Sequence, residues 1–331
     1  MLRSLARMKS VRVLSKSKIT ASISRSATIH HPLTGSVTNI NLIGFRLHNL
    51  SAQPDGRTPM EFDPYSPRPR AESLGLWQGW SPLRILLLIL VLGLLNFSCQ
   101  ILVFLAVGGL FLPVTAGAAA SLLAIFLIFR NQGFSREEDL RLGAVSPLAL
   151  GLALVMTLAA LPPSSLLAEL SLRLHPADPT WIRFYADNLK DTPAQMALAA
   201  LGGVVLAPLV EEILFRGLLQ RLVSRAWGPW AGIVVSALVF GLVHGEPWFL
   251  FGLIAVGLVL GFLYEATGSL IACWAAHALH NAVSLVVLFV QQDASLQPSE
   301  LHLGDWLLGA GSLVVLGVVG RWMWRNQVEH S

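Results

Sequence analysis

The chain has 331 residues, of which 54% are hydrophobic and only 13% are charged. Ordinary soluble domains carry about 25% charged residues, so this sequence lacks the polar shell that a soluble enzyme of this length needs. The mean hydropathy of +0.64 therefore predicts a polytopic membrane protein. We expect an all-α fold, because helices satisfy their own backbone hydrogen bonds within lipid.

The net charge of +4 and the pI of about 9.4 come from the beginning of the chain. The cations before Met60 face a single acid, Asp55, and the rest of the sequence carries more acids than cations, so we expect no nucleic-acid partner. Cys99 and Cys273 both lie in apolar runs, which indicates neither a disulfide framework nor a cysteine metal site. The leading cations are Arg3, Arg7, Lys9, Arg12, Lys16, Lys18, Arg25, Arg46 and Arg57.

Three regions follow from the change in composition along the chain. Residues 1–75 form a polar, basic leader that we expect to be disordered. It is typical of an organelle transit peptide; alternatively, Met60 is the true start and the residues before it are translated from a misplaced start codon. Residues 76–325 form the membrane domain, and residues 326–331 form a short polar tail.

About eight apolar segments are each near the ~20 residues that a helix needs to cross the hydrocarbon core. The short link around Pro247 is also compatible with a broken or re-entrant segment. The predicted spans are 83–107, 109–129, 142–161, 196–220, 230–246, 248–266, 269–291 and 304–322.

Loop charges predict the orientation of these spans. Arginines gather on one side, so the positive-inside rule makes both termini cytoplasmic in a bacterial plasma membrane, or stromal or matrix-facing in an organelle membrane if the leader is a transit peptide. These arginines are Arg68, Arg70, Arg84, Arg130, Arg136, Arg141, Arg221, Arg225, Arg321 and Arg325. The opposite side carries a mixed loop at 169–193 and the acids Glu246, Asp293, Glu300 and Asp305.

Ionisable residues inside the fourth span indicate a functional site, since a charge at mid-membrane costs at least ~2.5 to 3.5 kcal/mol. Glu212 and Arg216 are four residues apart on one helical face, which predicts an internal ion pair. Glu211 points about 100° away from Glu212 and lacks that partner. We therefore expect Glu211 to act as a general base.

Two further spans carry polar residues at similar depth. His244 lies in the fifth span, and His277 and Asn281 lie four residues apart on one face of the seventh. The rise of 1.5 Å per residue places these groups and Glu211 roughly 13 to 20 Å from the cytoplasmic ends of their spans. They meet in one intramembrane layer if their helices are neighbours.

Three chemistries are compatible with such a layer. A carboxylate with imidazoles and an amide can activate water and stabilise an oxyanion, as amide hydrolysis requires. Glu211, His244 and His277 alternatively form a ligand trio for catalytic zinc, although the motif H-E-x-x-H is absent. A proton-coupled transporter also places carboxylates and histidines at mid-depth.

The motifs E-E-x-x-x-R, F-x-x-x-H and H-x-x-x-N, in this order on separate apolar helices, resemble the CPBP family of intramembrane proteases. This family, also called Abi, includes the type II CAAX prenyl endopeptidases. The similarity covers a core at about 140–292. The motif residues in this chain are Glu211, Glu212, Arg216, Phe240, His244, His277 and Asn281.

The resemblance implies an eight-helix peptidase whose site opens toward the cytoplasm. Glu211 resembles the base that activates water with help from His244, while His277 and Asn281 resemble the oxyanion donors. Glu212, Arg216 and Phe240 resemble supporting residues. An amide is a poor zinc ligand and a good donor, so the metal-free glutamate mechanism suits the presence of an asparagine.

The resemblance leaves the substrate open. It implies a peptide or protein substrate, prenylated as in CAAX processing or of unassigned kind, acted on within the lipid bilayer. We expect no cofactor, with zinc as the alternative. A non-enzymatic membrane transporter or immunity factor is the alternative from another functional class.

Overall fold

The computed structural model describes residues 40–41, 46–47, 75–188, 192–291 and 298–327. Two compact units divide the chain, Met1–Pro69 and Arg70–Ser331. In the first unit, strand β1 (Ile40–Asn41) pairs antiparallel with strand β2 (Arg46–Leu47). The rest of the predicted leader, apart from Gly75, lies outside the described residues, as do residues 328–331 of the predicted tail.

The second unit is built from helices, so the predicted all-α polytopic membrane fold is confirmed. Seven helices among the described residues are long and apolar enough to cross a membrane. In chain order the helices are α1 (Leu76–Gly79), α2 (Pro82–Val107), α3 (Phe111–Gln132), α4 (Arg136–Leu140), α5 (Pro147–Leu174), α6 (Pro179–Asn188), α7 (Pro193–Leu198), η2 (Ala199–Leu206), α8 (Ala207–Glu212), η3 (Ile213–Gln220), α9 (Arg221–Trp227), α10 (Pro229–Val243), η4 (Pro247–Phe249), α11 (Leu250–Thr267), α12 (Leu270–Gln291) and α13 (Leu303–Gln327).

The fifth predicted span, 230–246, is shorter in the structure. Helix α10 has 15 residues and is about 22 Å long, less than the ~30 Å of the hydrocarbon core. It ends before His244, and Gly245 then turns the chain with a φ of 67°, a conformation that glycine adopts without steric cost. The end of α10 therefore leaves His244 at an interruption between two apolar helices.

The third predicted span and the loop after it also differ from the structure. Helix α5 runs past residue 161, through Pro162 and Pro163, to Leu174. Proline has no N–H, so Pro162 and Pro163 leave the carbonyls of Leu158 and Ala159 without their usual helical donors. Membrane helices tolerate such prolines when their surroundings satisfy the freed carbonyls. The segment predicted as a mixed loop contains the rest of α5 and helix α6.

A single apolar helix of 35 residues, Pro193–Trp227, contains the fourth predicted span. Two stretches of it, η2 and η3, are π-helical, a geometry that often marks functional sites. Carbonyls of η2 are bonded by another helix: Asn281 of α12 donates to Gly203, and Trp274 of α12 donates to Val205, both at 2.9 Å. The π-helical turn thus joins the fourth and seventh spans.

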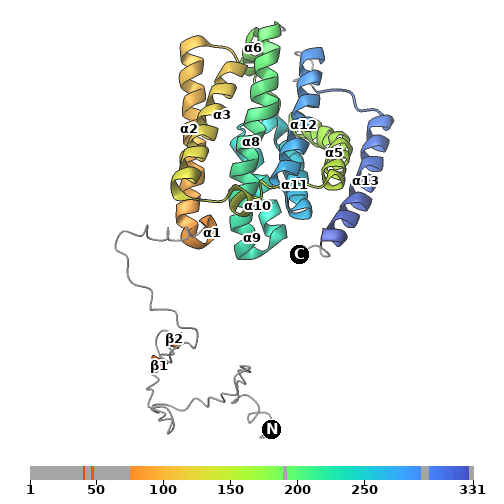
Figure 1. Cartoon of the computed structure of the whole chain (residues 1–331). Coiled ribbons are helices and arrows are strands. Elements are labelled where there is room, and N and C mark those ends of the chain that lie inside the picture. The colour runs from red at the N-terminus through yellow and green to blue at the C-terminus, as the bar shows by residue number, and fades with distance from the viewer. Residues whose placement is uncertain (1–39, 42–45, 48–74, 189–191, 292–297, 328–331) are drawn as a thin grey trace, which may run out of the picture. The chain divides into compact units, whose positions relative to one another are not determined.

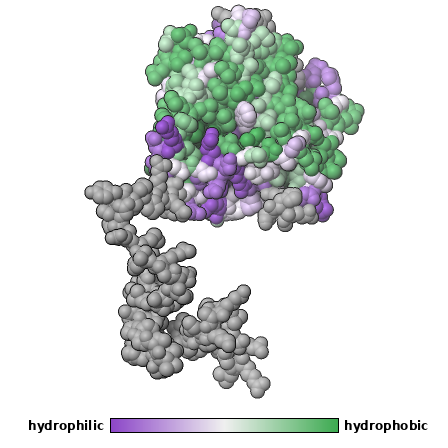
Figure 2. All heavy atoms as spheres, viewed as in Figure 1, coloured by the Kyte–Doolittle hydropathy of each residue, from purple (hydrophilic) through white to green (hydrophobic). Residues whose placement is uncertain are grey.

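The remaining helices surround this long helix. In Figure 1, α2 and α3 lie side by side at one edge, and α13 packs beside α5 at the other. Figure 2 shows a broad hydrophobic surface with polar residues gathered near one end of the bundle. Large apolar side chains such as Leu105 and Val290 are more than 70% exposed, as expected for a surface that faces lipid.

The predicted gathering of arginines at one end is supported by contacts. Arg221 donates to the carbonyls of Glu138 and Asp139 at 2.8 and 2.9 Å, and Arg141 lies 3.8 Å from the Glu265 carboxylate. These contacts join the region after the second span to the ends of the fourth and sixth. The side of the membrane that this end faces stays a prediction.

Close packing of α10 and α11 brings the polar residues together. A Cβ atom at Gly257 of α11 would lie 3.0 Å from the Cα of Ala237 in α10, which is tighter than most real Cβ contacts. Glycine at this position therefore permits the two helices to approach, and it exposes the Gly257 carbonyl to the long helix. Arg216 donates to that carbonyl at 3.1 Å.

Candidate active site

The predicted ion pair between Glu212 and Arg216 is present at the centre of the bundle. The Arg216 Nη1 atom lies 3.1 Å from the Glu212 Oε1 atom, and both side chains are completely buried. The guanidinium also donates to the Gly257 carbonyl and lies 4.7 Å from the centre of the Phe240 ring. Pairing and cation–π contact offset the cost of burying these two charges.

His277 of α12 lies between the two glutamates. Its Nδ1 atom is 2.7 Å from Glu212 Oε1, and its Nε2 atom is 3.6 Å from Glu211 Oε2. Glu212 is already bound to Arg216, so we assign the proton in the short contact to His277, whose Nδ1–H donates to the carboxylate. The Nε2 atom is then an acceptor directed at Glu211.

Glu211 differs from its neighbour in exposure. Its side chain is 26% exposed, whereas the Glu212 side chain is completely buried. The expectation from the helical angle was that Glu211 would lack the Arg216 partner, and the guanidinium indeed binds Glu212. Glu211 is thus the accessible carboxylate of the cluster, beside a histidine nitrogen that can receive a proton.

Phe240 of α10 links His244 to this cluster. Its buried ring lies edge-on to the rings of His244 and His277, with centroid distances of 4.6 and 5.7 Å. The His244 Nδ1 atom donates to the Phe240 carbonyl at 2.6 Å, which leaves Nε2 as an acceptor. The structure therefore joins His244 to the cluster through an aromatic ring, and the hydrogen bond of His244 goes to its own helix instead of to Glu211.

Asn281 lies one turn beyond His277 on α12. Its amide nitrogen donates to the Gly203 carbonyl in the π-helical stretch η2. This bond fixes the amide and engages one of its two N–H groups, and the second N–H is available to another acceptor. The two α12 residues are therefore held by different turns of the long helix, His277 by Glu212 and Asn281 by Gly203.

The zinc alternative requires three converging ligands. Among the residues that the structure describes, no three His, Cys, Asp or Glu side chains come together in a group that could hold a metal ion. Glu211 and His277 face each other, and His244 donates from Nδ1 to the Phe240 carbonyl, which leaves its Nε2 atom as an acceptor. Metal dependence therefore stays a prediction.

Sequence reasoning missed the backbone part of this site. The carbonyls of Gly203 and Gly257 accept hydrogen bonds from Asn281 and Arg216, yet backbone groups leave no signature of their own in a sequence. The available signal was indirect and held at one position only: glycine at 257 permits the close approach of α10 and α11, whereas the space around Gly203 is open.

Together the fold and the cluster define a class: a polytopic helical membrane protein with a buried cluster of ionisable side chains, one carboxylate of which is partly exposed. The model of the family described as Type II CAAX prenyl endopeptidase Rce1-like matches residues 193–283. This segment is narrower than the predicted core at 140–292, and it contains every motif residue. The match confirms the resemblance to the CPBP and CAAX protease family and supports a membrane protease. No curated protein and no solved structure matches the chain.

Proposed function

We propose that the protein is an intramembrane endopeptidase in which Glu211 activates water without a metal ion. One observation carries this proposal: the partly exposed Glu211 carboxylate lies 3.6 Å from His277, beside a completely buried Glu212 and Arg216 pair. A buried pair that neutralises itself holds the histidine in place. It leaves one carboxylate for proton transfer, which is what general-base hydrolysis needs.

The proposed reaction begins when Glu211 takes a proton from water as the water oxygen bonds to the scissile carbonyl carbon. His244 assists by accepting a hydrogen bond from this water at Nε2. The proton on Glu211 passes to Nε2 of His277, and the resulting imidazolium donates to the oxyanion together with Asn281. When the C–N bond breaks, His277 gives this proton to the leaving amine, so that water is divided between the two products.

The proposed substrate is the C-terminal part of a membrane-associated protein or peptide. The matched family is described as a prenyl endopeptidase family, so a prenylated cysteine motif is the first candidate. A substrate anchored in lipid by its prenyl chain would reach a mid-membrane site without leaving the bilayer. The positive-inside rule predicts both termini on the cytoplasmic side, or on the stromal or matrix side of an organelle membrane. The family resemblance implies that the site opens toward that same side.

Purified protein in detergent, incubated with matched prenylated and unprenylated reporter peptides, tests the proposal. We expect endoproteolytic cleavage that survives thorough chelation, with the prenylated reporter cleaved faster. Metal analysis of the same active sample provides the control. Activity that is lost on chelation and regained with zinc would overturn the metal-free mechanism, and absence of cleavage of both reporters would count against a CAAX-type substrate.

A further inference from the structure

Two adjoining pockets lie against α13, away from the catalytic cluster. One of about 310 Å³ is lined by Trp230, Phe262, Gly320, Arg321, Trp324 and Arg325. Its neighbour of about 220 Å³ is lined by Met156, Phe262, Leu316, Gly317, Gly320 and Arg321. Because they share Phe262, Gly320 and Arg321, we treat the two as one depression and call it the α13 groove.

One end of the α13 groove is cationic. Arg321 and Arg325 are four residues apart in the last turns of α13, so their side chains project from the same face. Both are exposed, and neither has a hydrogen bond or ion pair with any residue that the structure describes. The lining contains no acid. This end therefore presents, to whatever fills the groove, two positive charges that no described residue pairs.

Aromatic rings form the wall beside these arginines. Trp324 lies 5.1 Å from Trp230 and 5.9 Å from Phe262, measured between ring centroids. Tryptophan is enriched at the depth of lipid headgroups, where its apolar ring and polar N–H are both accommodated. The contact between Trp324 and Trp230 also places this end of α13 beside the start of α10.

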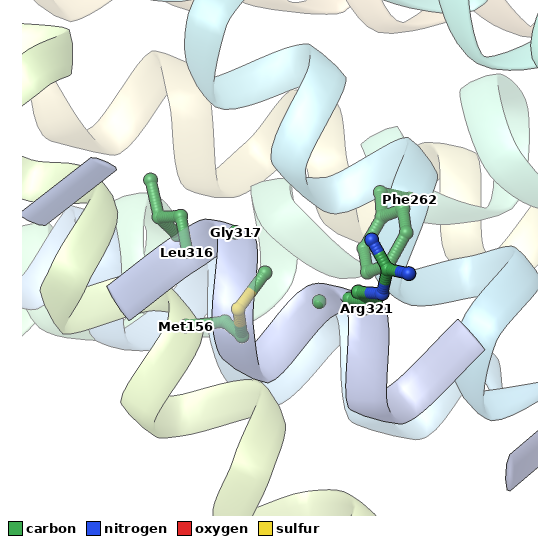
Figure 3. Close-up of a pocket in the computed structure, with 6 residues that line it drawn as sticks. Met156, Phe262, Leu316, Gly317 and Arg321 are labelled. Carbon is green, nitrogen blue, oxygen red and sulfur yellow. The ribbon is translucent and has the colours of Figure 1, made fainter. Parts of the chain in front are cut away.

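The other end of the groove is apolar. In Figure 3, Met156 of α5 and Leu316 of α13 lie at one end of the pocket, and Phe262 and Arg321 lie at the other. Leu316 is five residues before Arg321 in α13, which places it roughly 7 Å deeper along the helix. Gly317 adds no side chain to fill the space. The groove thus passes from cations at the helix end to apolar walls nearer the bilayer centre.

We propose that the α13 groove binds one anionic glycerophospholipid. Arg321 and Arg325 hold the phosphate diester, Trp230 and Trp324 flank the headgroup, and one acyl chain lies along Phe262, Met156 and Leu316. Charge selects this occupant. A prenyl chain fits the apolar half but leaves both guanidinium groups without a counter-charge. A zwitterionic lipid brings a headgroup cation together with its phosphate, so only an anionic headgroup supplies net negative charge to the two arginines.

This site is separate from the proposed chemistry. None of the groove residues belongs to the cluster formed by Glu211, His277 and their partners. Lipid binding can therefore be measured without an assay for peptidase activity, and failure of either proposal leaves the other unaffected.

Native mass spectrometry of the purified protein, titrated with phosphatidylglycerol and with phosphatidylcholine, tests the proposal. We expect one phosphatidylglycerol to bind more tightly than further lipids and than phosphatidylcholine. Changing Arg321→Gln or Arg325→Gln should each weaken this first binding event about five-fold, and changing both about 25-fold, since each cation near an anionic headgroup contributes about 1 kcal/mol.

The matched control changes Arg84→Gln and Arg130→Gln together. These arginines are also exposed, lie near the ends of α2 and α3, and line neither pocket. The control should bind phosphatidylglycerol like the native protein. Equal weakening in the control, equal affinity for the two lipids, or displacement by the same concentration of inorganic phosphate would each overturn the proposal. Thermal unfolding in detergent checks that every variant is folded.

Discussion

Two buried polar networks fasten the long helix to α11, and they are related by one turn. Arg216 donates to the Gly257 carbonyl at 3.1 Å, and Gln220, four residues later, donates to the Gly261 carbonyl at 2.9 Å. Each network also contains a glutamate: Glu212 binds Arg216 in the first, and Glu265 binds Gln220 in the second. The same helix pair thus carries two similar arrangements at two depths.

The networks differ in what lies beyond the shared contacts. In the second, Glu265 accepts from Gln220 at 3.1 Å and from Ser224 at 3.0 Å, and it lies 3.8 Å from Arg141. Those partners are the side-chain amide of Gln220, the hydroxyl of Ser224 and the guanidinium of Arg141 near the surface, which suit a structural contact between helices. The first network instead continues through His277 to the partly exposed Glu211. Both networks contain buried charge, so the proposed chemistry rests on the second, accessible carboxylate beside a histidine.

The largest expected effect comes from removing that second carboxylate. Glu211→Gln keeps the side-chain shape but cannot take a proton, so peptidase turnover should fall by roughly 10² to 10⁴. Turnover of the reporter peptide by purified protein measures this. Glu300→Gln, which removes an exposed carboxylate distant in sequence, is the control and should leave the rate unchanged. Near-native turnover of Glu211→Gln would remove this glutamate from the mechanism.

The next effect is on folding and concerns the buried pair. Arg216→Met strands the Glu212 charge and should cost about 3 to 5 kcal/mol in the free energy of unfolding. Combining it with Glu212→Gln removes the stranded charge and keeps an acceptor for His277, so the double variant should be the more stable. Thermal unfolding in detergent checks this order. Strictly additive losses would mean that the two residues are not energetically coupled.

A somewhat smaller effect is expected from the proposed oxyanion donor. Asn281→Ala should lower kcat by roughly 10² to 10³ with little change in KM, and Asn281→Asp should lower it further, because a carboxylate repels the developing charge. His280→Ala is the control, since its side chain points about 100° away from that of Asn281. If His280→Ala is as inactive as Asn281→Ala, the wrong face of α12 has been assigned to the site.

The smallest effect concerns Glu246, in the turn between α10 and η4. Burial raises the pKa of this carboxyl above its ordinary value of 4.5, and the nearby His244 opposes that shift. A raised pKa in the folded state means that stability falls as the pH rises through 4.5, because the unfolded chain ionises first. Glu246→Gln should therefore raise the unfolding temperature slightly at pH 7, with no gain at pH 4. A gain that does not depend on pH would contradict this explanation.

Hydropathy was sufficient to predict the fold class and the approximate positions of the spans. It could not predict the extent of α5, because the helix passes Pro162 and Pro163 only where its surroundings satisfy the freed carbonyls. Helix α6 was missed for a different reason: it lies in a segment of mixed composition that we read as a loop. The π-helical stretches have no residue pattern that separates them from an α-helix.

Spacing within one helix predicted part of the site. The four-residue separation predicted the contact between Glu212 and Arg216, which the structure contains. Spacing also predicted that His277 and Asn281 share a face, but it could not say which groups on other helices they meet. The bonds from His277 to Glu212 and from Asn281 to Gly203 depend on how α12 packs against the long helix.

One experiment distinguishes the roles of the two networks. It compares the variants Glu211→Gln and Glu265→Gln by peptidase turnover and by thermal unfolding. The proposed roles predict opposite outcomes: Glu211→Gln unfolds like the native protein but is nearly inactive, whereas Glu265→Gln unfolds at lower temperature but retains turnover for each folded molecule. If Glu211→Gln instead loses stability and keeps its activity, the accessible glutamate is structural and the proposed active site is wrong.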